Sequence, residues 1–102
     1  MEILEKYVRR GCRTASRVWG DTAYVMLMPR NSSDLKPKAF GLSPNGTLIW
    51  KLLEEKSKVD EVVDRFAKAK GIDRESATEE VVKFIQKLAA QEVVEILDNP
   101  GE

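Results

Sequence analysis

The chain contains no histidine, and Cys12 is its only cysteine. Without histidine there is no imidazole for acid–base chemistry near neutral pH or for activating a thiol, and no Cys/His set for zinc. A single cysteine cannot form an intramolecular disulfide, which indicates a reducing compartment. The sequence therefore excludes the common histidine- and cysteine-based catalytic sites, and we interpret Cys12 as a spectator.

Long apolar runs and phosphate-binding loops are also missing. No stretch approaches the roughly 20 apolar residues of a membrane span, and residues 1–6 lack the apolar core of a signal peptide. Gly41 and Gly46 are isolated, so neither the Walker nor the dinucleotide spacing is present. Carboxylate pairs such as Glu54 and Glu55 fall on polar helix faces, where they are solvated. We expect a cytoplasmic protein that is not an enzyme and uses no cofactor and no metal.

Charge of one sign is not in surplus, because 17 basic and 17 acidic residues balance. This balance argues against an autonomous nucleic-acid-binding protein. The charges are nevertheless divided. Residues 1–41 hold eight basic and four acidic residues (net +4), and residues 42–102 hold nine and thirteen (net −4). Two interpretations stay open: each half solvates its own face and attracts the other, or the basic first half attracts an acidic partner.

What is present fits one domain, since 102 residues can build one core but not two. Three short strands are predicted between residues 13 and 42, at about 13–19, 22–28 and 36–42. Gly20 and Asp21 indicate a two-residue hairpin between the first two. Pro37 lacks an amide donor, which restricts the third strand to an edge or Pro37 to a strand start. Residues 1–12 are compatible with either a short helix or an arm lying on the sheet.

Residues 45–97 form the helical half. Apolar residues at helical spacing predict helices at about 45–55, from about 57–60 to 71, and at 73–88. Residues 93–97 close the chain as a half-turn or a short extended segment. The result is an α+β fold resembling a winged helix-turn-helix, in which a three-stranded antiparallel sheet precedes a three-helix bundle. The predicted caps are Ser43 or Asn45 for the first helix, Ser57 or Asp60 for the second and Asp73 for the third, with Gly71 ending the second.

The segment 42–53 reads Leu-Ser-Pro-Asn-Gly-Thr-Leu-Ile-Trp-Lys-Leu-Leu. It resembles a signature of the PqqD-like family of pyrroloquinoline quinone biosynthesis proteins and related precursor-peptide recognition elements, in which a Gly turn leads into an Ile-Trp-x-Leu-Leu helix. Residues 58–66 and 71–88 resemble the family's second and third helices, and 92–94 its Gly-Leu-Val ending. The likeness spans about residues 13–96. Ser-Pro-Asn-Gly at 43–46 departs from the family's usual Asn-x-Thr-Gly turn, which leaves room for another peptide-modification pathway.

The resemblance implies a non-catalytic chaperone that holds the leader of a ribosomally made precursor peptide. The leader adds as a strand to the third strand, beside the third helix, and is presented to a modifying enzyme, often a radical S-adenosylmethionine protein. An open edge strand fits this mode of binding. The residues expected to contact the peptide are Lys36, Lys38, Ala39, Phe40 and Gly41 on the strand and Val82, Ile85, Gln86 and Ala89 on the helix.

Alternatives remain for several of these positions. Phe40 and Ile85 can instead be plain core residues, and the two lysines can be ordinary edge protection. Trp50 is expected in the core or on the groove floor, with a partner for its indole nitrogen. Tyr7 and Trp19 can mark a second surface, for the enzyme or for a second copy of the chain, and a homodimer is compatible with exposed strand edges.

The alternative function is a winged-helix nucleic-acid-binding or regulatory domain whose third helix enters the major groove. The helix offers the polar and basic residues Arg74, Lys83, Gln86 and Lys87 against Glu75, Glu79 and Glu80, which is a poor surface for phosphate. We therefore favour peptide binding.

Overall fold

The computed structural model describes residues 2–28 and 38–98. Its elements, in chain order, are η1 (Glu2–Glu5), β1 (Tyr7–Arg10), β2 (Thr14–Trp19), β3 (Thr22–Leu27), β4 (Lys38–Gly41), α1 (Pro44–Leu52), β5 (Ser57–Lys58), α2 (Val59–Lys70), α3 (Arg74–Ala90) and β6 (Val94–Leu97). The three-stranded antiparallel sheet of β2, β3 and β4, followed by three helices, confirms the predicted α+β, winged-helix-like fold. The predicted loop after residue 28, with Lys36 and Pro37, lies outside the described residues.

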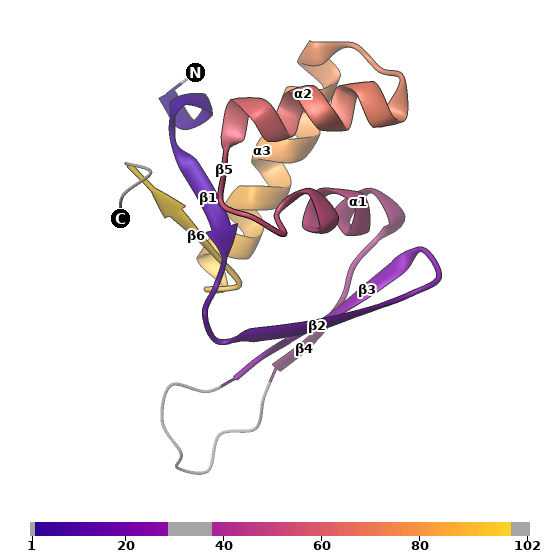
Figure 1. The fold of residues 1–102 in the computed structure, drawn as a ribbon, viewed down its shortest axis with the longest axis vertical. Coiled ribbons are helices and arrows are strands. Elements are labelled where there is room, and N and C mark those ends of the chain that lie inside the picture. The colour runs from indigo at the N-terminus through magenta and orange to yellow at the C-terminus, as the bar shows by residue number, and fades with distance from the viewer. Residues whose placement is uncertain (1, 29–37, 99–102) are drawn as a thin grey trace.

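The three predicted strands form an antiparallel sheet in the order β2-β3-β4. The β2–β3 hairpin pairs Trp19 with Thr22 across Gly20 and Asp21. Gly20 has a φ of 65°, which glycine adopts without a steric penalty. Along β3 the buried Ala23, Val25 and Leu27 alternate with more accessible residues. One face of this sheet therefore packs on the core, and α1 lies against that face (Figure 1).

A second antiparallel sheet has the order β5-β1-β6. Its central strand β1 pairs Val8 with Ser57 on one side and with Ile96 on the other. Val8 is fully buried. The open alternatives for residues 1–12 and 93–97 thus resolve into a short 3-10 helix leading into a strand, and a closing strand. Strands β1 and β6 lie side by side because each supplies hydrogen-bond partners for the backbone amides and carbonyls of the other.

The caps of α1 and α3 agree with the sequence. Ser43 begins α1, and its hydroxyl oxygen accepts a hydrogen bond from the Gly46 amide at 3.1 Å. Asp73 begins α3 and accepts from the Ser76 amide at 3.2 Å. Gly71, with a φ of 66°, ends α2 in the left-handed conformation.

The predicted cap of α2 is wrong. Lys58 occupies the cap position and makes no side-chain capping bond. The Ser57 hydroxyl instead donates to the Glu55 carbonyl at 3.1 Å. The first amide of the helix, that of Val59, donates to the Lys6 carbonyl at 2.9 Å. The N-terminal segment of the chain therefore satisfies an amide that a serine or aspartate cap would leave for other partners.

Trp50 lies at the centre of the core, 1% exposed, as predicted. Its indole Nε1 donates to Ser16 Oγ on β2 at 3.0 Å. The Arg10 guanidinium stacks on the ring, 4.5 Å from the centroid, and donates to the Trp50 carbonyl at 2.7 Å. Burial lowers the pKa of Arg10, and Glu54 opposes this shift. Trp50 thus joins the helices to both sheets.

Candidate functional site

Strand β4 is an edge of its sheet, because among the described residues it pairs only with β3. The Leu42 amide just beyond it donates to the Ala23 carbonyl on β3 at 2.9 Å. Backbone groups along a strand point alternately to its two sides, so the amides and carbonyls of Ala39 and Gly41 point away from β3. This edge offers a row of backbone donors and acceptors, as strand addition requires.

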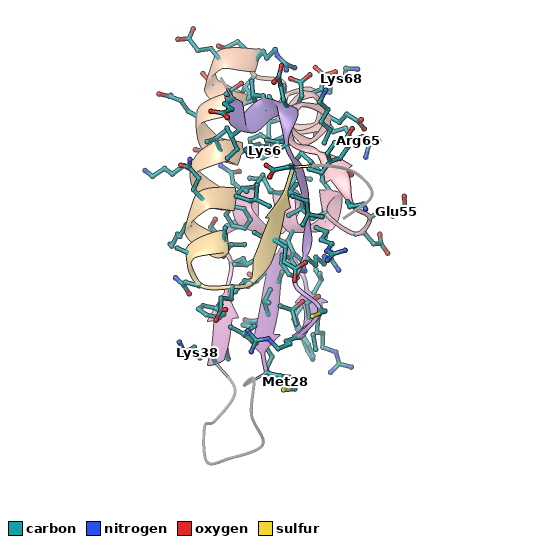
Figure 2. The ribbon with its side chains drawn as sticks, turned by 90° about the vertical axis from the view of Figure 1, so that its left-hand side faces the viewer. Lys6, Met28, Lys38, Glu55, Arg65 and Lys68 are labelled. Atoms are coloured by element: carbon teal, nitrogen blue, oxygen red, sulfur yellow. The ribbon has the colours of Figure 1, made fainter. Side chains whose placement is uncertain are left out.

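Helix α3 lies on the same side of the molecule as β4. In Figure 2 the strand that carries Lys38 runs below the C-terminal end of α3, at the edge of the sheet. A Cβ at Gly46 would lie only 2.7 Å from Cε1 of Phe84. The glycine therefore lets the Phe84 ring reach the first turn of α1, directly after β4. Phe40 on β4 and Phe84 on α3 are both half-buried and pack against the common core.

The predicted strand residues lie at this edge. Lys38, Ala39 and Gly41 are exposed, and Phe40 is half-buried on the side of the sheet that faces the helices. Lys36 lies outside the described residues. Phe40 is thus partly a core residue, in agreement with its alternative interpretation as a plain core residue.

The predicted helix residues of α3 differ in burial and in the hollows that they line. Ile85 is fully buried in the core, and Val82 is 7% exposed. Val82 and Gln86 line a hollow of about 540 Å³ whose described lining comes from α3 alone. Ala89 lines another, of about 310 Å³, with Gly11 and Val94 among its neighbours. The described lining of both hollows contains no β4 residue, so the joint contact of these helix positions and the strand with a peptide stays a prediction.

Phe84, which approaches Gly46 beside β4, is not among the helix residues expected from the sequence. A helical residue turns by about 100° from the one before it, so Val82 and Gln86 lie nearly opposite Phe84 around α3. Residues one turn from Phe84, such as Glu80 and Lys87, share its side of the helix. The available signal in the sequence was Gly46, because a glycine can mark a position where another part of the chain approaches the backbone closely. The sequence could not say which helix approaches it.

Helix α3 carries three acidic and three basic residues, and one of the basic ones is engaged within the fold. Arg74 forms ion pairs with Asp60 and with Asp64 on α2, the latter at 2.9 Å. One of the few cations available for phosphate contact is therefore engaged within the fold, which disfavours the nucleic-acid alternative. Within residues 2–28 and 38–98, no group of three His, Cys, Asp or Glu side chains could hold a metal ion. The described helices include none long and apolar enough to cross a membrane.

The model of the family described as "Coenzyme PQQ synthesis protein D (PqqD)" matches residues 23–94. The chain belongs to the PqqD family. The match begins inside β3 and ends at the start of β6, so it contains the edge strand, all three helices and the turn at Gly46. The family resemblance in the sequence is thereby confirmed.

A solved structure similar to this PqqD-family protein is "TbiB1 in Complex with the TbiA(beta) Leader Peptide". The two chains are 25% identical, with a TM-score of 0.73, and the match covers 85% of this chain and 94% of the other. That relative was solved with a leader peptide bound. The comparison with curated proteins gave no match.

Proposed function

We propose that this protein is a non-catalytic chaperone that binds the leader of a ribosomally made precursor peptide by strand addition to β4. It presents the peptide to a modifying enzyme, which the family resemblance suggests is a radical S-adenosylmethionine protein. The observation that carries the proposal is the unpaired outer side of β4 among the described residues. The leader peptide in the complex of the similar protein supports it.

The proposed site has a backbone part and a side-chain part. Ala39 and Gly41 supply outward backbone donors and acceptors, and inward side chains of the leader face the half-buried Phe40 and Phe84. Main-chain pairing gives affinity without sequence preference, whereas pockets for alternate side chains give specificity. Lys38 is exposed at the end of β4 and adds attraction for an acidic leader. Peptide contact by Val82, Ile85, Gln86 and Ala89 stays a prediction.

The direct test is a titration of the ¹⁵N-labelled protein with synthetic leaders of precursor peptides encoded beside its gene. Binding should shift the amide resonances of residues 38–42 most strongly. Calorimetry would give the affinity. If none of these leaders binds, or if the shifts avoid β4, the proposal is wrong.

A proline at position 39 tests strand addition specifically. The Ala39 amide points away from β3, so Ala39→Pro removes a donor from the open edge and leaves the β3–β4 ladder intact. We expect leader affinity to fall by about tenfold or more, since one hydrogen bond contributes about 1 kcal/mol and the ring also hinders the added strand.

The matched control is Val18→Pro. The Arg13 carbonyl accepts from the amide of Met28, directly after β3. By alternation, the Val18 amide points away from β3, at the other edge of the same sheet. Leader affinity should stay within about twofold of wild type. Circular dichroism would confirm that both variants fold. Equal losses in the two variants would contradict addition at β4.

A further inference from the structure

The face of the β2-β3-β4 sheet turned away from α1 carries large apolar side chains. We call it the outer sheet face and define it by Arg17, Trp19, Tyr24, Met26, Ala39 and Gly41. The strand register places Arg17, Tyr24 and Gly41 side by side in one row across the three strands, with Met26 and Ala39 in the next row. Figure 1 shows all three helices on the opposite side of this sheet.

These apolar groups are exposed to a degree that the fold itself does not require. Trp19 is 72% exposed, Tyr24 56% and Met26 41%, whereas alternate β3 residues such as Val25 are buried. A solvated face of an antiparallel sheet normally carries polar side chains. A shallow hollow of about 260 Å³ lies here, lined by Tyr24, Met26 and Ala39 among others. A contiguous aromatic and thioether surface of this kind is typical of a protein-docking site.

The charge of the hollow restricts what can cover it. Among the described residues that line it, Arg17 is the only charged one. The guanidinium is exposed, and it makes no hydrogen bond or ion pair with the described part of the chain. Covering the guanidinium would bury an unpaired charge unless the covering surface provides a hydrogen-bond acceptor. The complementary partner therefore presents an apolar patch containing at least one carboxylate.

A second copy of the chain fits this face poorly. Two identical faces related by a two-fold axis would bring two Arg17 guanidinium groups into one interface, and the described lining of the hollow supplies no carboxylate to pair with them. The face is also small. A standard stable interface uses roughly 20–30 residues a side, several times the number that defines this face. Size and charge both point to a transient contact with a different protein.

The position of the outer sheet face indicates what kind of protein this partner is. Ala39 and Gly41 belong both to the outer sheet face and to the open edge of β4, and Tyr24 Cε1 lies 3.7 Å from a Cβ placed on Gly41. A protein seated on the aromatic surface would thus lie directly beside a strand added to β4. We propose that the outer sheet face docks the peptide-modifying enzyme through an apolar, carboxylate-bearing patch. This inference rests on the proposed function.

The test is calorimetry of the full chain against the purified modifying enzyme encoded beside the precursor gene, with and without saturating leader. Trp19→Ser and Arg17→Glu are the test variants. Ile72→Ser and Arg65→Glu are the matched controls, because Ile72 is 36% exposed between α2 and α3 and Arg65 is exposed on α2, both remote from the sheet. We expect each test variant to weaken enzyme binding by at least about tenfold, and each control by less than about twofold.

Leader affinity, measured in parallel, separates this inference from the proposed function. It should stay within twofold of wild type in all four variants. Loss of leader binding in Trp19→Ser would assign the face to the peptide and overturn the inference, as would unchanged enzyme binding in both test variants or an enzyme that does not bind the wild type. A wild-type protein that binds enzyme but no leader would instead refute the proposed leader-binding function.

Discussion

Asp73 is the N-cap residue of α3, and hydrogen bonds from Ser76 lower the pKa of its exposed carboxylate. The Ser76 hydroxyl donates to Oδ1 at 2.8 Å, and its amide donates to Oδ2 at 3.2 Å. Both bonds favour the charged form, and the side-chain bond has the larger effect on the pKa. Ser76 therefore bonds to the capping carboxylate at the start of α3 and also lowers the pKa of that carboxylate.

The first prediction concerns the pH dependence of this cap. A lowered pKa in the folded state stabilises the fold above the ordinary aspartate value of 3.8, and this contribution disappears as pH falls through the lowered pKa. Ser76→Ala should raise the pKa of Asp73 toward 3.8 and reduce the loss of stability on acidification. An NMR titration of the Asp73 carboxyl carbon checks the shift. An unchanged pKa in the variant would show that the hydroxyl has no part in it.

At the scale of the element, α2 shows how a helix start can depend on a distant segment. Its first amide bonds to the Lys6 carbonyl, and its cap residue Lys58 also pairs with Tyr7 of β1. The Lys58 side chain makes no capping bond to the other amides of the first turn. The helix therefore begins where β5 ends, with the backbone of the N-terminal segment in place of a conventional cap.

The missing cap predicts a stabilising substitution. Lys58 has the extended backbone of a cap residue, with φ −70° and ψ 138°, so Lys58→Ser can accept a bond from the second or third helical amide. We expect the free energy of unfolding to rise by about 0.5–1 kcal/mol, measured by urea denaturation. Lys58→Ala removes the same charge without adding an acceptor and should give no gain. Equal effects of the two substitutions would show that charge, not capping, is responsible.

At the scale of the whole molecule, Trp50 connects parts that are far apart in the sequence. The indole bonds to Ser16 of β2, and Arg10 of β1 covers the ring. No ladder joins the two sheets within residues 2–28 and 38–98, so this group of side chains helps set their relative orientation. It thereby also helps place the edge strand β4, which belongs to the β2 sheet, relative to α3.

A double-mutant cycle tests this connection. Ser16→Ala and Trp50→Phe each remove one partner of the same hydrogen bond. The two substitutions should therefore couple by about 1 kcal/mol in the free energy of unfolding. Urea denaturation of the wild type, both single variants and the double variant gives the coupling. Additive effects would mean that the bond contributes nothing to the stability of the fold.

The sequence by itself determined the features that depend on neighbouring residues. Ser43 and Asp73 cap their helices through bonds spanning three residues, and Gly20 and Gly71 supply the left-handed turns. The amphipathic stripes of the helices and the family signature around Trp50 belong to the same class. Such signals are local, so they can be read without knowing the fold.

Only the tertiary structure decided the pairings between distant segments. A four-residue strand such as β1 has no pattern of its own, and it forms because β5 and β6 supply its backbone partners. Likewise, which side of α3 faces β4 depends on the contact between Phe84 and Gly46, and helical periodicity alone leaves that rotation undetermined. The exposure of Trp19 and Tyr24 also follows from the sheet's orientation, because alternation along a strand defines two faces but not which of them the helices cover.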